Sequence, residues 1–165
     1  MKKAFDQIDN EILEALQNHA RLSNKELAAQ VGLAPSSCLE RVRRLQDAGV
    51  IRGYRAKVSP EAMGIGLQAF VFVRLSQHDR EEVEAFRAHV EGLEETVSIY
   101  HVAGESDYLV HVAVRNAEHL KDLALDAFTT RKEVDRIRTS LIYEHVHQPV
   151  LPNYALADSL EDEAQ

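Results

Sequence analysis

The first third of the chain has apolar residues at intervals of three and four, the period of an α-helix. Asp6 can cap a first helix, whose apolar stripe comprises Ile8, Ile12, Leu13 and Leu16. A second helix starts at Ser23, which can form a capping box with Glu26, and it ends at Gly32. Pro35 suits the first position of a third helix, whose buried stripe comprises Cys38, Val42 and Leu45. Because the turn between the last two helices is so short, the pattern predicts a helix-turn-helix.

The exposed face of the third helix carries hydroxyl, carboxylate and guanidinium groups. In a helix-turn-helix, the second helix enters the major groove and its N-terminal residues meet base edges. The serines and the glutamate of this face are therefore expected to contact bases, and its arginines bases or phosphates. After Gly49, an extended arm corresponds to the wing of a winged helix-turn-helix. The candidate DNA-binding residues of helix and arm are Ser36, Ser37, Glu40, Arg41, Arg43, Arg44, Arg52, Arg55 and Lys57.

The negative charge of the protein is unevenly distributed along the chain. The chain has a formal net charge of −8, but residues 1–59 carry +3 and residues 60–165 carry −11. A duplex responds to the local field, and residues 33–59 hold six basic side chains against two acidic ones. Double-stranded DNA is therefore the expected partner, and a solvated basic helix in a small helical domain is the alternative.

The periodicity changes after Pro60 and the glycines Gly64 and Gly66. Strands are predicted at 67–76, 95–103, 107–114 and 134–147, with a turn at 104–106. Asp79 and Asn116 can cap two intervening helices. The order βαββαβ predicts a ferredoxin-like α+β sandwich with both helices on one face of an antiparallel sheet. The expected domains are a winged helix-turn-helix at 1–59, a linker at 60–66, the βαββαβ domain at 67–148 and an acidic tail at 149–165.

The predicted sheet has apolar residues on both faces. On the first strand, Leu67, Ala69, Val71, Val73 and Leu75 share one face, whereas Phe70 and Phe72 lie on the other. On the middle strands, the expected members of a second apolar face are Tyr100, Val102, Tyr108, Val110, Val112 and Val114. A face without helices must be buried against something, most simply a second copy. We therefore expect a homodimer, which would present two recognition helices to a two-fold-symmetric site.

The composition predicts a cytoplasmic protein. The single cysteine, Cys38, excludes an internal disulfide and suits a reducing compartment. The apolar runs are much shorter than the roughly 20 residues that cross a bilayer, and the N-terminus does not read as a signal segment. Cys38 is expected in the core by its periodicity, with a redox switch as the alternative.

The chain to about Gln148 resembles the Lrp/AsnC, or feast/famine, family of bacterial and archaeal transcriptional regulators. The matching residues of the first domain are Glu26, Leu27, Ala28, Val31, Gly32, Leu33, Pro35, Ser36, Cys38, Arg41, Val42, Arg44, Leu45, Gly49, Val50, Ile51, Tyr54, Pro60 and Gly64. In the second domain, Gly104, Asp107, Tyr108 and Leu109 are similar to the family's Gly-x-x-Asp-Tyr-Leu hairpin, and 138–140 to its final strand. Ala34 departs from the family pattern of a Ser or Thr cap, which weakens the cap by about 1 kcal/mol.

The resemblance implies dimers that assemble further, often into octamers that wrap DNA, and an amino-acid effector bound between dimers. It implies no cofactor. The implied effector-binding residues are Gly104, Glu105, Ser106, Asp107, Tyr108, Thr139 and Ser140. Backbone N–H groups of the turn can hold a carboxylate, and an acidic side chain there can pair with an ammonium group. The alternative is that Gly104 and Asp107 only build the turn.

Other functions have less support in the sequence. Eight histidines include His101, His111, His145 and His147, but no clustered cysteine or carboxylate partners accompany them, so no metal site is predicted. No catalytic motif is present, which argues against an enzyme. The alternatives to a ligand-responsive regulator are an effector-independent architectural protein that wraps DNA and a ligand-binding oligomer whose helical domain serves assembly.

Overall fold

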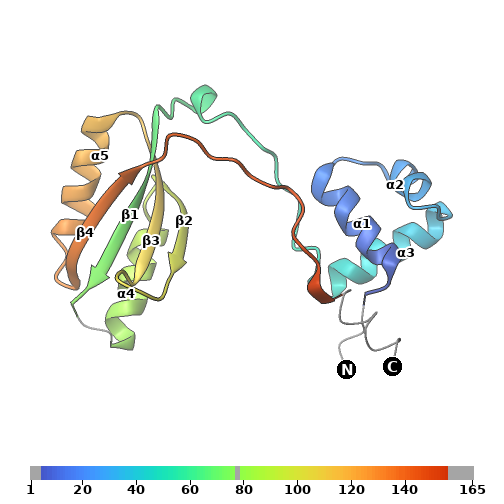
Figure 1. Ribbon diagram of the computed structural model, residues 1–165, viewed down its shortest axis with the longest axis horizontal. Coiled ribbons are helices and arrows are strands. Elements are labelled where there is room, and N and C mark those ends of the chain that lie inside the picture. Colours follow the sequence, from blue (N-terminus) through green and yellow to red (C-terminus); the bar gives the residue numbers. More distant parts are fainter. Residues whose placement is uncertain (1–4, 77–78, 156–165) are drawn as a thin grey trace. The chain divides into compact units, whose positions relative to one another are not determined.

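The computed structural model describes residues 5–76 and 79–155 (Figure 1). The described residues form two compact units. One unit contains residues 5–57 together with 146–155, and the other contains residues 58–145. Residues 156–165, which belong to the expected acidic tail, lie outside the described part of the chain.

The first unit contains the helices that the sequence predicts. They are α1 (Gln7–Asn18), α2 (Asn24–Gln30) and α3 (Pro35–Asp47). Asp6 and Ser23 cap α1 and α2, and each forms a capping box with the residue three positions on. The core comprises Ile12, Ala15, Leu16, Leu27, Ala28, Val31, Cys38 and Leu45. The predicted helix-turn-helix is confirmed.

The backbone on either side of α3 differs in regularity. Ala34 has the extended backbone of an N-cap but makes no side-chain hydrogen bond to the helix, so the expected weak cap is present. Gly32 has φ +68°, the left-handed conformation that ends α2. Beyond α3, residues 50–58 form no strand. The segment expected to form the wing therefore has no regular secondary structure.

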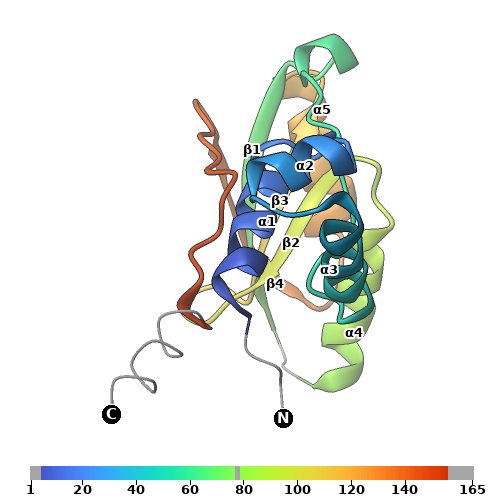
Figure 2. The same cartoon turned by 90° about the vertical axis from the view of Figure 1, so that its right-hand side faces the viewer.

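The second unit is the predicted βαββαβ sandwich. Its elements are β1 (Leu67–Leu75), α4 (Arg80–Glu91), β2 (Thr96–His101), β3 (Tyr108–Val114), α5 (Ala117–Leu123) and β4 (Val134–Leu141). The helix α5 continues as a π-helical turn, η2 (Ala124–Thr129). The antiparallel strands have the order β2-β3-β1-β4, as a ferredoxin-like sheet requires. Figure 2 shows α4 and α5 on the same side of this sheet.

One side of the sheet packs against the helices. Its core joins Val71 and Val110 from the strands to Phe86 and Val90 from α4 and to Leu120, Leu123, Ala127 and Phe128. The predicted membership of the two faces is wrong for β3. Tyr108, Val110, Val112 and Val114 lie on the helix side, because the register places Val110 opposite Val71 and Tyr108 opposite Val73. The open side of β3 therefore carries Leu109, His111 and Ala113.

The last strand is shorter than predicted. It ends at Leu141 and not at 147, and the Ile142 N–H makes a further bond to the Gln68 carbonyl at 2.9 Å. Because β4 pairs only with β1, and β1 begins at Leu67, the sheet offers no partner to later residues. Residues 142–147 therefore form no strand.

The segments on either side of the α+β unit are anchored by specific contacts. Before β1, residues 61–63 form a 3-10 turn, and the Gly66 N–H donates to the Val114 carbonyl at 3.1 Å. A Cβ on Gly66 would collide with the Arg115 carbonyl oxygen, so this close approach requires glycine. In the helical unit, the C-terminal segment contacts α1: the Leu151 N–H donates to Gln17 Oε1 at 2.9 Å, and Asn153 Nδ2 donates to Asn10 Oδ1 at 2.8 Å.

Candidate functional site

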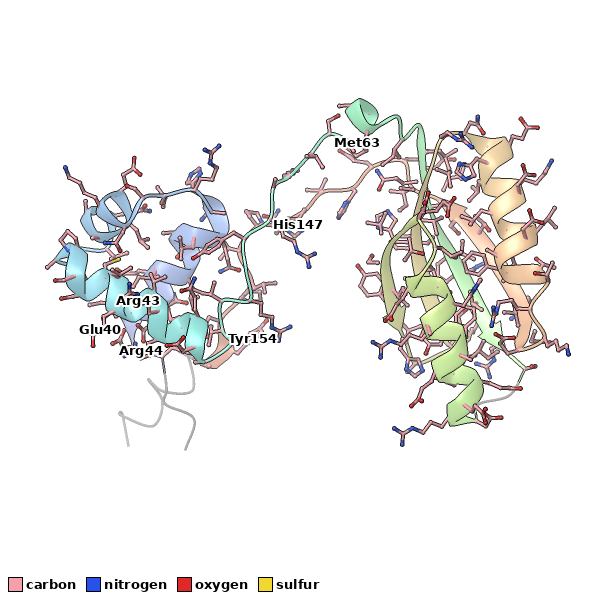
Figure 3. All side chains as sticks on the ribbon, turned by 180° about the vertical axis from the view of Figure 1, so that it is seen from behind. Glu40, Arg43, Arg44, Met63, His147 and Tyr154 are labelled. Carbon is pink, nitrogen blue, oxygen red and sulfur yellow. The ribbon has the colours of Figure 1, made fainter. Side chains whose placement is uncertain are left out.

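The N-terminal part of α3 presents a polar surface to solvent. Ser36, Ser37, Glu40 and Arg43 line a shallow hollow along the helix, and the two serines and Glu40 are exposed. Figure 3 shows Glu40 and Arg43 projecting from this helix. No ion pair or hydrogen bond engages the Arg43 side chain among the described residues, which leaves its guanidinium available for a phosphate or a base edge.

Two other arginines of α3, which line the same hollow, also form ion pairs with residues at the start of α1. Arg41 Nη1 lies 2.6 Å from the Asp6 carboxylate and 2.9 Å from the Asp9 carboxylate. Arg44 Nη2 lies 2.5 Å from Asp9 Oδ2. The Asp9 side chain is only 2% exposed, so its charge needs these partners. Arg41 and Arg44 also line the hollow of α3, as the sequence predicts, but helical periodicity could not reveal their ion pairs with residues near the start of α1.

The ion pairs hold α3 against α1. Burial alone would raise the pKa of Asp6, but hydrogen bonds from Arg41 and from the Asp9 backbone N–H outweigh it and hold the pKa of that carboxyl below its usual value. Hydrogen bonds from Arg41 to the carboxylates of Asp6 and Asp9 raise the pKa of Arg41. The two arginines therefore hold α3 in a fixed orientation on α1, and the Arg44 side chain stays 41% exposed to solvent.

The basic residues C-terminal to α3 lie in the irregular segment. Arg52, Arg55 and Lys57 are all exposed. Gly53 has φ +145°, a backbone conformation that side-chain-bearing residues rarely adopt. Nothing within the described chain fixes the direction of these three side chains. They remain candidates for phosphate contacts, which position a protein on DNA without reading sequence.

The hairpin between β2 and β3 is built by Asp107 and Gly104. Asp107 Oδ2 accepts a hydrogen bond of 2.8 Å from the Leu75 N–H, and its Oδ1 lies 3.5 Å from Arg74 Nη1. Arg74 also donates to the Gly104 carbonyl at 3.2 Å. Gly104 has φ +132°, so the turn requires glycine. The carboxylate of Asp107 is committed to holding the turn on the end of β1, whereas Glu105 is exposed.

The remaining predicted effector residues do not converge on the hairpin. Tyr108 is 2% exposed and belongs to the helix-side core, where its ring contacts Phe86 at a centroid distance of 5.1 Å. Thr139 pairs with Val71 and Ser140 with Phe70. They lie several residues along the sheet from Arg74, where the hairpin is attached, and a strand rises about 3.3 Å per residue. Of the predicted effector residues, those that lie at the turn and are accessible to solvent are Gly104, Glu105 and Ser106.

A groove beside the hairpin contains arginines that sequence reasoning missed. The groove has a volume of about 330 Å³ and is lined by Phe72, Arg74, Glu105, Ser106, Arg136, Ile137 and Arg138. The guanidinium carbon of Arg138 lies 4.3 Å from the centroid of the Phe72 ring, a cation–π contact. The sequence could have indicated this groove, because Arg136 and Arg138 are two residues apart and residues two apart share a face of a strand. We call this cavity the arginine groove.

The described histidines form no cluster that could hold a metal ion, and the cysteine is buried. Among residues 5–76 and 79–155, no group of three or more histidine, cysteine or carboxylate side chains is placed to hold a metal ion. His111 Nε2 lies 2.8 Å from Gln68 Oε1, and burial together with the nearby His145 lowers its pKa. Cys38 is buried, and burial raises the pKa of its thiol, which opposes reactivity.

The fold and these surfaces define a DNA-binding protein with an N-terminal helix-turn-helix and a C-terminal α+β domain. Residues 5–52 match the winged helix-turn-helix DNA-binding model, and residues 68–150 match the Lrp/AsnC ligand-binding domain. The chain belongs to the Lrp/AsnC family of transcriptional regulators. Its relatives are transcriptional regulators and not enzymes.

Relatives of known name and structure cover most of the chain. It is 42% identical over 142 residues to the transcriptional regulator AldR of Mycolicibacterium smegmatis, covering 86% of this chain and 83% of that protein. It is 37% identical over 146 residues to the leucine-responsive regulatory protein of Escherichia coli K12, covering 88% and 89% of the two chains. A Neisseria meningitidis transcriptional regulator solved with L-methionine superposes with a TM-score of 0.84 at 35% identity, covering 90% and 96%. A feast or famine regulatory protein of Mycobacterium tuberculosis, also solved with L-methionine, gives a TM-score of 0.77 at 37% identity, covering 87% and 95%.

None of the helices in the described part of the chain is both long enough and apolar enough to cross a membrane.

Proposed function

We propose that this regulator binds specific DNA sites through α3 and that an amino acid bound at the α+β domain changes its affinity for them. The observation that carries the DNA-binding part is the polar surface of Ser36, Ser37, Glu40 and Arg43, held in place by ion pairs on the adjacent side of α3. In this scheme Ser36, Ser37 and Glu40 meet base edges, and Arg43 meets a base or a phosphate. Arg44, Arg52, Arg55 and Lys57 add phosphate contacts.

The amino-acid effector is supported by the relatives. Two regulators with TM-scores of 0.84 and 0.77 were solved with L-methionine. In this chain, the turn at 104–106 offers an exposed carboxylate, exposed backbone and the adjoining groove. The proposed position of the effector, between two dimers, lets a ligand act on assembly as well as on one domain.

The proposed dimer uses the open side of the sheet. Phe70 and Leu109 lie there without a covering helix, and Tyr100 and Val102 are exposed beside them. A second copy would bury these apolar side chains, since the helices cover only the opposite side. Such a homodimer presents two copies of α3 to DNA, and further assembly, for example to an octamer, would add more. The cytoplasm is the expected compartment for such an assembly.

The first experiment is a thermal-shift screen of the full-length protein against the twenty amino acids, because a ligand of the folded state raises Tm by mass action. DNA fragments selected from a random pool then give the preferred site, and fluorescence anisotropy gives Kd with and without each stabilising amino acid. A selective amino acid that changes Kd supports the proposal.

The same experiment separates the two parts of the proposal. Equal Kd values with and without every amino acid would contradict effector control and favour an architectural role in wrapping DNA. Failure to enrich any sequence from the pool would contradict specific recognition. Arg43→Ala serves as the control that the measured binding uses α3.

A further inference from the structure

The arginine groove brings three guanidinium groups together on the open side of the sheet. Arg74 on β1 pairs in register with Arg136 on β4, and Phe72 pairs with Arg138. Neighbouring strands are about 4.8 Å apart and residues two apart on a strand about 7 Å, so the three side chains emerge within reach of one small ligand. The turn carrying Glu105 and Ser106 forms the facing wall.

The positive charges of the groove exceed the negative charges of the acidic side chains beside it. Arg74 is shared between the Gly104 carbonyl and the Asp107 carboxylate. Neither Arg136 nor Arg138 makes an ion pair with any described residue. Counting Glu105 and Asp107 against the three arginines leaves a formal charge of +1 in a domain that is otherwise strongly acidic. A bound anion would relieve the mutual repulsion of the guanidinium groups.

The remaining walls indicate the chemistry of that anion. Two adjacent arginines favour bidentate carboxylate recognition, Glu105 can pair with an ammonium group, and Phe72 provides an apolar surface. A volume of about 330 Å³ is at the low end of small-molecule sites, which span roughly 300–1,000 Å³. A free amino acid with an acidic side chain carries two carboxylates and one ammonium, and its net charge of about −1 matches the groove.

We propose that the arginine groove is an effector site for an acidic amino acid, with Arg136 and Arg138 holding a carboxylate and Glu105 the ammonium group. This inference rests on the proposed control by an amino acid and specifies its class. A neutral zwitterion would leave one guanidinium uncompensated. An acidic side chain of a second copy could also fill the groove, and the experiment distinguishes that case.

The test uses full-length protein titrated by calorimetry with L-glutamate, L-aspartate, L-leucine and L-methionine. Arg136→Gln and Arg138→Gln each remove one charge from the groove and keep a long polar side chain, so folding is preserved. Arg115→Gln removes an exposed arginine outside the groove and is the matched control. The expected result is binding of an acidic amino acid, weakened at least tenfold by each groove variant and unchanged by the control, with the same mass in size-exclusion chromatography.

Three other results would overturn the inference. Binding of leucine or methionine that both groove variants leave unaltered would place a neutral effector elsewhere, and the proposed function would stand. A lower oligomer mass in the variants, without ligand binding to the parent protein, would assign the arginines to contact with a second copy. No binding of any of the four and an unchanged mass would remove this site, and the twenty-amino-acid screen would then decide whether effector control itself fails.

Discussion

The carboxylate of Asp9 on α1 lies 2.5 Å from the guanidinium of Arg44 on α3 and is almost completely buried. This ion pair joins the first helix of the domain to the recognition helix. It divides the arginines of α3 into two kinds, since Arg43, one residue earlier, has no such partner among the described residues.

Arg44→Ala should lower the free energy of unfolding of the DNA-binding domain by about 1–3 kcal/mol, because it removes a charged partner from a buried carboxylate. Arg43→Ala should change it by less than about 0.5 kcal/mol. Urea denaturation measures both. Equal stability of the two variants would contradict a structural role for Arg44.

Arg43→Ala should instead weaken DNA binding, with the oligomer mass unchanged. If Arg43 contacts a phosphate, the slope of log K against log salt should also fall by about 1. Fluorescence anisotropy at several salt concentrations measures this. Lys25→Ala, a change of an exposed basic residue on α2, is the control and should leave the slope unaltered.

Ala34→Ser should stabilise the domain by about 1 kcal/mol. Ala34 already has φ −65° and ψ 144°, so a serine hydroxyl could cap α3 without a change of backbone. Thermal unfolding of both proteins measures the gain. Ala34→Val adds bulk without a capping oxygen, and an equal gain from valine would show that capping is not the cause.

Asp107→Ala should destabilise the α+β domain by about 1–3 kcal/mol, because the buried Leu75 N–H loses its acceptor. Asp107→Asn keeps an oxygen for that bond and removes the charge that faces Arg74, so its cost should be smaller. Circular dichroism during denaturation measures the order of the two variants. The reverse order would make the charge, and not the hydrogen bond, the main contribution.

The stability of the α+β domain should fall as the pH drops below about 6.5. Burial lowers the pKa of His111 from its ordinary 6.5, so the unfolded chain binds a proton first and protonation favours unfolding. The contribution of His111 is present above about pH 6.5 and is lost as the pH falls through the lowered value. Comparing His111→Gln with the parent protein between about pH 5 and 8 isolates it, with His145→Gln as a second comparison because His145 contributes to the lowered pKa.

The sequence predicted the helix-turn-helix closely because its signals are local. Capping by Asp6 and Ser23, the proline that starts α3 and the glycine after α2 depend on residues a few positions apart. The same signals cannot show that Arg41 and Arg44 turn towards α1. Their partners on α1 lie far away along the chain, and only packing brings them together.

For the second domain, the order of elements correctly predicted the ferredoxin-like fold. The predictions of which side of the sheet the apolar residues of β3 face and of where β4 ends were wrong. Alternation shows which residues of one strand share a side, and strand register decides to which side they turn. The arginine groove has the same origin, since it combines β1, β4 and the hairpin.

The sequence by itself determined that this protein is a helix-turn-helix regulator with a βαββαβ domain, because period, capping and turn chemistry are written in neighbouring residues. Only the tertiary structure decided which arginines of α3 pair with acidic residues near α1, which residue of the hairpin holds the turn on β1, and which arginines gather around one groove. Those properties depend on contacts between distant segments, and such contacts exist only after the chain has folded.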